Sequence, residues 1–348
     1  MQTKCENCAG KLIFSPEDKA VKCEHCGITK GVPYVTSFSK KDFVDVIDIE
    51  QEQTNELKKI KCKSCGAEIV LGARDIQATC PYCGDSSMSQ ARKAKIVSVD
   101  SIIPFSFGKT KALQMFKKEI AGHFFTNKKL FNNVKKEDVK GMYVNSFVFD
   151  YDTSSIYKGV FSYSKSYTDS DGHFKTKTVD VNVSGTHNLK IENITIEANS
   201  KLNQADFAYI QGYKYQEAVK FHEDFLNGYM IEYQDANFET YAKKAQDIAV
   251  SRIKNSLLDR YNCTKIETLN LHTNYLSKKC NYCLLPVYFI NTIDPKTNEK
   301  IQVLMNGQTG KVGKTPKNMS RILLIVFLFL AIVLGVIGAS LFFIFFVV

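Results

Sequence analysis

The chain has 348 residues, of which 44% are hydrophobic and 24% charged, with abundant phenylalanine and tyrosine and no tryptophan. This composition excludes a disordered chain, and the length allows two or three domains with cores of their own. The formal net charge of +10 raises the question of nucleic-acid binding, but Lys311, Lys314, Lys317 and Arg321 gather within residues 311–321. Bulk charge is therefore weak evidence for that class of partner.

A pair of CxxC motifs stands near the amino terminus and recurs once with the same fourteen residues between its two halves. The eight cysteines are Cys5, Cys8, Cys23, Cys26, Cys62, Cys65, Cys80 and Cys83. Two residues between cysteines let one tight turn direct both sulfurs at a single ion, and a following glycine favours the positive φ of such a knuckle. The repeat predicts two zinc ribbons, with iron in a rubredoxin-like site as the alternative. Eight thiolates and two zinc ions would lower the net charge to about +6.

Both metal sites are predicted to be structural rather than hydrolytic, because four thiolates leave no open coordination position. His25 could replace a thiolate, but a solvent-facing position is favoured for it. Apolar runs at Leu12 and Ile69 predict hairpins that are too small for a core and depend on zinc to fold. The first ribbon is assigned to residues 1–37, a charged linker with some helix to 38–60, and the second ribbon to 61–95.

Residues 96–310 have the pattern of an α+β domain with an antiparallel sheet. Apolar residues at helical spacing predict two amphipathic helices, and alternating residues separated by turn signals predict strands. The helices are expected at Lys109–Phe124 and Ala236–Tyr261, and the strands at Met142–Tyr151, Ile156–Tyr167, Phe174–Val183, Leu284–Ile293 and Lys300–Met305. Asp171 and Gly172 mark a hairpin turn, so this domain is predicted to contain an antiparallel meander.

Three further cysteines lie in this domain, and a third metal site is the first alternative for them. Cys280 and Cys283 form another CxxC pair near Cys263 and His272. The pair enters an apolar strand, however, and strand geometry directs the two side chains to opposite faces. Structural thiols are therefore favoured over a metal site, and a catalytic Cys263 with His272 is weaker still because no orienting carboxylate accompanies them.

The segment 307–315 (GQTGKVGKT) is close to a phosphate-binding loop but has Gln308 where a glycine is required. A phosphate-binding loop also needs a following helix whose amino terminus faces the phosphate, whereas Pro316 follows here. A turn that ends the last hairpin is favoured, and no nucleotide is expected. Asp169 and Asp171 lack the ligand series of an EF-hand and are predicted to be turn residues, and His222-Glu223 lacks the second histidine of a metalloprotease helix.

The chain ends with residues 322–348, which carry no charge. This length of apolar sequence predicts one transmembrane helix, preceded by a basic juxtamembrane stalk at 311–321. The positive flank predicts a tail-anchored, single-pass protein of the cell membrane with its amino-terminal bulk in the cytoplasm. A reducing compartment also favours metal ligation by the paired thiols over disulfide bonds.

Four segments together resemble a family of bacterial membrane-anchored proteins with tandem transcription-factor-IIB-type zinc ribbons. These segments are the paired ribbons and residues 141–150 (GMYVNSFVFD), 285–289 (LPVYF) and 305–311 (MNGQTGK). Members are often labelled as primosomal replication-restart helicases, but this chain has no proper phosphate-binding loop and no room for two motor domains. Phe147 stands where the family pattern tends to have tryptophan. The resemblance implies an architecture and no defined activity.

The sequence favours a non-enzymatic, zinc-binding, membrane-anchored adaptor or scaffold that faces the cytoplasm and binds a protein partner. The alternative is a membrane-tethered nucleic-acid-binding protein that contacts phosphates through the second ribbon. Its basic residues are Lys61, Lys63, Arg74, Arg92, Lys93 and Lys95. Tyr82 is the main stacking candidate there. An enzyme is the least favoured class because no helicase, protease or nucleotide-binding motif is intact, and no catalytic residue is assigned.

Overall fold

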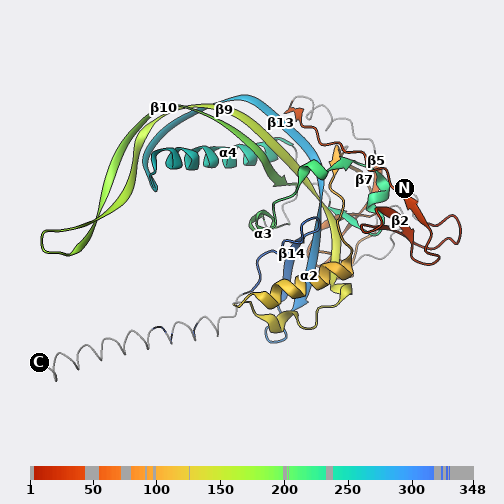
Figure 1. Ribbon diagram of the computed structural model, residues 1–348. Coiled ribbons are helices and arrows are strands. Elements are labelled where there is room, and N and C mark those ends of the chain that lie inside the picture. Colours follow the sequence, from red (N-terminus) through yellow and green to blue (C-terminus); the bar gives the residue numbers. More distant parts are fainter. Residues whose placement is uncertain are drawn as a thin grey trace, which may run out of the picture.

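Three very long strands form the spine of the molecule (Figure 1). The computed structural model describes residues 4–43, 55–71, 80–90, 92–96, 99–124, 126–198, 202, 204–232, 238–316, 323, 327 and 329. The strands are β9 (Val139–Thr168), β10 (Phe174–Glu197) and β13 (Lys265–Ile293), with 30, 24 and 29 residues. β10 and β13 both pair antiparallel with β9, which lies between them. The predicted antiparallel pairing is therefore present, but the order β10-β9-β13 is not that of a meander, in which successive strands are neighbours.

The two strands predicted at 142–151 and 156–167 are one continuous strand. The intervening residues are polar, which suggested a break, but Thr153 and Ser155 are 2% and 0% exposed and continue the inward-facing row of β9. Thr153 Oγ1 donates a hydrogen bond of 2.8 Å to the carbonyl of Leu189 in β10. Satisfied hydroxyl groups can occupy core positions, so the alternation continues where side-chain polarity alone predicts a loop.

The three strands curve into an arch (Figure 1). The pairing register shifts between Ile191 and Ile194 in β10, and it shifts twice in β13, first between Ile266 and Thr268. Bulges of this kind bend a strand and increase its twist. At the first β13 bulge, a Cβ on Gly159 would lie 2.2 Å from the carbonyl oxygen of Thr268. Only glycine allows the two backbones to approach so closely there.

Helix α4 (Phe238–Tyr261) lies along the concave side of the arch and confirms the helix predicted there. Its buried face carries large residues at Phe238 and Tyr241, followed by small ones at Ala245 and Ala249. Phe238 and Tyr241 pack against Phe147 of β9, with ring centroids 5.5 and 5.4 Å apart. The alanines let the helix lie close to the sheet, which completes one of the main hydrophobic clusters.

A second core lies at the other end of the long strands, under helix α2 (Lys109–Gly122). α2 confirms the predicted amphipathic helix and buries Ala112, Phe116 and Ile120. The remaining elements in this part are short: β8 (Ser101–Ile102), η1 (Lys128–Phe131), η2 (Lys136–Asp138), α3 (Gln204–Tyr209), η3 (Tyr215–Glu217), β11 (Val219–Lys220), η4 (Glu223–Leu226), β12 (Met230–Glu232) and β14 (Lys300–Asn306). β14 pairs antiparallel with β13, as the predicted closing hairpin requires.

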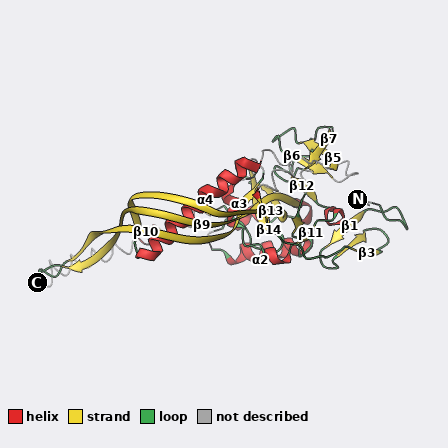
Figure 2. Cartoon of the chain, turned by 90° about the horizontal axis from the view of Figure 1, so that it is seen from above, coloured by secondary structure: helices red, strands yellow, loops and turns green. Residues whose placement is uncertain are grey.

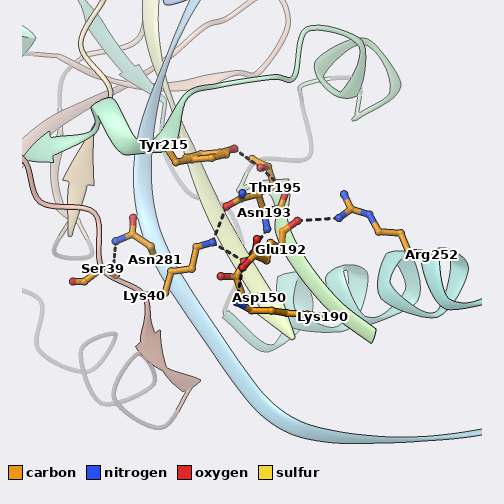
Figure 3. Close-up of polar contacts among 10 residues, drawn as sticks. All are labelled: Ser39, Lys40, Asp150, Lys190, Glu192, Asn193, Thr195, Tyr215, Arg252 and Asn281. Carbon is orange, nitrogen blue, oxygen red and sulfur yellow. Dashed lines mark hydrogen bonds and ion pairs between the residues drawn. The ribbon is translucent and has the colours of Figure 1, made fainter. Parts of the chain in front are cut away.

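The segment that follows the first ribbon is fixed to the long strands (Figure 3). Strand β4 (Lys41–Asp42) pairs with β13, and the ammonium group of Lys40 lies 2.6 Å from Asp150 Oδ1 in β9 and 2.7 Å from Asn193 Oδ1 at the β10 bulge. The Nδ2 group of Asn281 donates a hydrogen bond to the carbonyl of Ser39. The start of the predicted charged linker is thus docked on the sheet. Its end, residues 55–60, is part of strand β5 (Asn55–Lys61), and a helix within 44–54 would lie outside the described residues.

In the part of the chain that the structure describes, no helix is long and apolar enough to cross a membrane. The longest helix among the described residues, α4, has 24 residues but carries charged side chains such as Lys243, Asp247 and Arg252. This finding contradicts the predicted transmembrane helix, and with it the tail-anchored, single-pass placement in the cell membrane with a cytoplasmic bulk. Of the predicted span 322–348, only residues 323, 327 and 329 are described. The zinc assignment therefore rests on thiol geometry and not on the compartment.

Candidate metal centres

The first zinc ribbon is a small three-stranded sheet with its sulfurs gathered at one end. Its strands are β1 (Leu12–Ser15), β2 (Ala20–Cys23) and β3 (Thr29–Gly31), in the order β1-β2-β3. The four ligand atoms of Cys5, Cys8, Cys23 and Cys26 all lie within 4.8 Å of one another. The Cys5–Cys26 and Cys8–Cys23 sulfur distances are 3.6 and 3.5 Å.

These distances suit a tetrahedral zinc site. Zn–S bonds of about 2.3 Å in tetrahedral geometry place the sulfurs about 3.8 Å apart, whereas a disulfide would bring two of them to about 2.05 Å. The backbone N–H of Ile28 is the main cause that lowers the pKa of the Cys26 thiol to about 6. At Cys8, by contrast, the backbone N–H of Gly10 lowers the pKa, but desolvation and the neighbouring thiols together raise it to about 12. A thiol with a lowered pKa loses its proton to a metal more readily.

The second ribbon repeats this geometry. Its strands are β5 (Asn55–Lys61), β6 (Glu68–Leu71) and β7 (Arg92–Ile96), and β5 pairs with both of the others. The sulfurs of Cys62 and Cys83, and those of Cys65 and Cys80, lie 3.6 Å apart. All four again fall within 4.8 Å of one another. Two structural zinc ions, one for each group of four cysteines, thus fit the predicted ligands.

Each knuckle is closed by the same backbone hydrogen bond. The N–H of Ala9, Gly27, Gly66 and Gly84 donates to the carbonyl of the first cysteine of its CxxC pair, over 2.9 to 3.1 Å. All four donors have positive φ. A residue larger than glycine would clash at position 10, since an added Cβ would lie 2.8 Å from His25 Cβ and 3.0 Å from Cys23 Sγ. His25 itself is exposed and lies outside the group of four sulfurs.

The first ribbon is attached to the α+β part through its β1–β2 side. Phe14 packs edge-on against Phe225, with centroids 5.2 Å apart, and its backbone N–H donates to the carbonyl of Asn227 over 2.8 Å. Glu17, in the β1–β2 turn, accepts a hydrogen bond of 2.7 Å from the N–H of Gly108, at the amino terminus of α2. A carboxylate there stabilises a helix whose own cap residue offers no side chain.

The second ribbon is attached through its sheet and its second knuckle. β6 pairs antiparallel with β12, which pairs parallel with β9. The ring of Tyr82 packs on Phe289, with centroids 5.4 Å apart, and its hydroxyl donates to the buried carboxylate of Glu232. Gln302 donates from Nε2 to the carbonyl of Tyr82 over 2.6 Å. Tyr82, predicted as a stacking residue for bases, instead anchors the ribbon to the sheet.

The remaining cysteines do not form a third site with His272. Cys280 and Cys283 are fully buried in two different hydrophobic clusters, as strand alternation predicts. Burial raises the pKa of Cys283 to about 12, so this thiol stays protonated. Cys263 is 8% exposed, and its Sγ lies 3.5 Å from the carbonyl of Tyr261. These side chains are core thiols.

The glycine-rich segment is a hairpin turn and not a phosphate-binding loop. Asn306 Oδ1 accepts hydrogen bonds from the N–H groups of Gln308 and Thr309, and the N–H of Gly310 donates to the Asn306 carbonyl. The N–H of Gly313 donates to the carbonyl of Leu304 in β14. These amide groups are already paired within the protein, so they do not form the open cradle that phosphate binding requires.

Asp169, Asp171 and His173 have ligand atoms within 4.8 Å of one another in the β9–β10 turn. Asp169 Oδ1 accepts hydrogen bonds from the backbone N–H groups of Asp171 and His173, and its other oxygen lies 2.7 Å from the ammonium group of Lys175. The carboxylate of Asp169 is thus used to shape the turn, which agrees with its predicted role.

The basic residues of the nucleic-acid alternative are described only in part. Lys61 and Lys63 are exposed on either side of Cys62. Arg74 lies outside the described residues, and Arg92, Lys93 and Lys95 lie on strand β7. The neighbouring Lys59 forms an ion pair of 2.9 Å with Glu68.

Comparison with known proteins links nearly the whole chain to one relative. The sequence is similar to the uncharacterized protein YdjG of Bacillus subtilis (strain 168), with 25% identity over 323 residues that cover 92% of this chain and 91% of that protein. No family model matches the sequence. No solved structure matches it either.

Proposed function

We propose that the chain is a non-enzymatic adaptor that binds a protein partner through its zinc knuckles. The observation that best supports this proposal is the orientation of the knuckles. On the docked sides of the ribbons, Phe14 contacts Phe225 of η4 and Tyr82 contacts Phe289 of β13. By contrast, Asn7 and His25 of the first ribbon are exposed. A metal-fixed loop presents its side chains at little entropic cost, which suits recognition of a partner.

The closed coordination supports a structural use of the metal. Four thiolates fill each tetrahedron and leave no position for water or substrate. The two ribbons are also fixed to the same α+β body, because the first is bonded through Asn227 and the second through β12. Figure 2 shows both zinc-binding sheets at the end of the molecule opposite the β9–β10 turn. A partner can thus contact both ribbons at once.

Site-specific photo-crosslinking tests this proposal. A photoreactive amino acid at Asn7 or His25 of the full chain is expected to give the same discrete protein adduct in cells. A photoreactive residue at Thr297, which is exposed in the β13–β14 turn, is the matched control and is expected to give none. Loss of the adduct in Cys5→Ser would tie it to the folded ribbon. Identical adducts at all three positions, or none at Asn7 and His25, would overturn the adaptor proposal.

Nucleic-acid binding is the second candidate, and the exposure of Lys61 and Lys63 beside the first cysteine of ribbon two is the observation that favours it. If these lysines contact phosphates, affinity for duplex DNA falls with salt, with a log-log slope of about −0.9 for each phosphate neutralised. The charge reversals Lys61→Glu and Lys63→Glu would then flatten this slope, whereas Lys296→Glu, at an exposed control lysine, would not. Binding that is weak and insensitive to these changes would leave the adaptor as the better function.

A further inference from the structure

A cavity of about 760 Å³ lies between the end of α2, the end of α3 and the segment that follows β14. Glu119, Ile120 and His123 contribute to its wall from α2 and the residue that follows it, Tyr209 from α3, and residues 309–315 from the final segment. A volume of this size is within the range of small-molecule sites. No zinc ligand lines it, so it is separate from both metal centres.

Two lysines give this cavity a cationic wall. The ammonium groups of Lys311 and Lys314 lie 5.5 and 5.9 Å from the centroid of the Tyr209 ring, and that of Lys311 also lies 3.3 Å from the carbonyl of Gln211. Among the described residues, neither lysine forms an ion pair with a carboxylate. Glu119, the one acid among the described residues that line the cavity, is paired with His123 over 2.9 Å.

The cavity also has an apolar lining. Met115, Ile120, Phe124 and Val312 line the cavity, and Phe124 is 59% exposed. Tyr209, whose ring lies under both ammonium groups, is 48% exposed. Large apolar side chains beside two ammonium groups suit a ligand with an anionic end and an apolar body, because each part then meets a surface of its own kind.

The cationic wall is held in place by its backbone. A Cβ on Gly310 would lie 2.0 Å from Met115 Cε, and one on Gly313 would lie 2.9 Å from the carbonyl oxygen of Leu304. The hydroxyls of Thr126 and Thr315 are 2.9 Å apart, which joins the final segment to the region after α2. Such packing reduces the entropy lost when a ligand binds. The amides of Thr309, Gly310, Lys311 and Gly313 are already paired, so the lysine side chains are the main groups left to recognise an anion.

We infer that this cavity binds a phosphate monoester that carries an apolar group. Two ammonium groups match the charge of about −1.5 to −2 on a phosphate monoester at neutral pH better than the single charge of a carboxylate. The apolar body lies against Ile120 and Phe124. The ester can come from a lipid headgroup or from a small alkyl phosphate, since both present the same chemistry.

Calorimetry with the full chain tests this site. The probes are hexyl phosphate, short-chain phosphatidic acid, inorganic phosphate, hexanoate and hexanol. Hexyl phosphate is expected to bind with a stoichiometry of one. Hexanol lacks the anion, hexanoate has one charge and inorganic phosphate lacks the apolar part, so all three are expected to bind more weakly. Tighter binding of phosphatidic acid than of hexyl phosphate would assign the natural ligand to lipids, and the reverse would assign it to small phosphate esters.

Charge-removing variants locate the binding. Lys311→Gln and Lys314→Gln are each expected to weaken hexyl phosphate binding about five-fold, the usual size of one partly exposed ionic contact. Both lysines are exposed, so the fold should persist in these variants. Lys296→Gln removes the same charge from another exposed site and should leave affinity unchanged. No binding of any phosphate probe, equal binding of hexyl phosphate and hexanol, or equal effects of all three substitutions would overturn the inference.

Discussion

The residue that follows each CxxC pair has positive φ in all four knuckles, although only three of these residues are glycine. Gly27, Gly66 and Gly84 have φ values of 75°, 73° and 73°, and Ala9 has 55°. The CxxC spacing is enough to predict the eight ligands, and the following glycines predict the backbone turn. The positive φ of Ala9 could not be predicted from its residue type, because alanine usually avoids the left-handed region.

Replacement of Ala9 by glycine is therefore expected to stabilise the first ribbon. A Cβ in the left-handed region costs about 1–2 kcal/mol, and the greater freedom of glycine in the unfolded chain offsets about 0.5–1 kcal/mol of this gain. The free energy of unfolding should rise by about 0.5 kcal/mol, measured as resistance of the zinc-loaded chain to a chelator or to heat.

Gly27→Ala is the matched reverse experiment. Nothing lies within 4 Å of a Cβ at Gly27, so its effect isolates the backbone strain. It should lower the stability of the same ribbon by about 1 kcal/mol. If Ala9→Gly destabilised the ribbon while Gly27→Ala had no effect, the positive φ at these knuckles would not be a source of strain.

At the scale of elements, local periodicity predicted the positions of both long helices and the antiparallel pairing. It did not predict the full length of the strands. Polar residues such as Thr153 and Ser155 resemble a loop in sequence, yet they are buried in β9. Their hydroxyls bond to groups on β10 and β13, at Leu189 and Thr273. Partners so distant in sequence cannot be inferred from a local pattern.

The attachment of residues 38–43 leads to a prediction about Lys40. Its side chain is 10% exposed and joins Asp150 of β9 to Asn193 at the β10 bulge. Lys40→Met removes this cation and leaves the Asp150 carboxylate, 23% exposed, with one fewer partner. Breaking a buried pair is strongly destabilising, but partial solvation reduces the cost here, so we expect a loss of about 2 kcal/mol in urea unfolding.

Lys41→Met serves as the control for this substitution. Lys41 forms an ion pair of the same length, 2.6 Å, with Asp100, but its side chain is 39% exposed. The loss should therefore stay below about 1 kcal/mol. Equal losses for the two variants would mean that the burial of Lys40 adds nothing to the attachment of this segment.

At the scale of the whole molecule, both zinc ribbons are packed on the α+β part through residues remote in sequence. Phe14 contacts Phe225, and Tyr82 contacts Phe289. The hydrophobic character of these residues is visible in the sequence, but their partners are not, because the two residues of each contact lie far apart in the sequence. The sequence could thus identify the metal sites and their ligands, whereas the orientation that exposes one side of each ribbon required the structure.

Zinc content tests the two ribbons separately. The purified full chain is expected to contain two zinc ions, one for each group of four cysteines, measured by elemental analysis or native mass spectrometry. Cys5→Ser and Cys62→Ser should each retain one ion, because removal of a thiolate weakens only its own site.

The two variants should differ in their effect on the rest of the fold. Phe14 and Glu17 attach the first ribbon, whereas β6 of the second ribbon extends the main sheet through β12.

Cys62→Ser is therefore expected to increase hydrogen exchange at β12, at Ile231 and Glu232, where loss of β6 removes a strand partner. Cys5→Ser should instead increase exchange at Gly108, whose N–H donates to Glu17. Each variant is the control for the other, since both remove one thiolate. A chain that loses both ions on either substitution would show that the two sites are coupled, and iron in place of zinc would overturn the assignment of the metal.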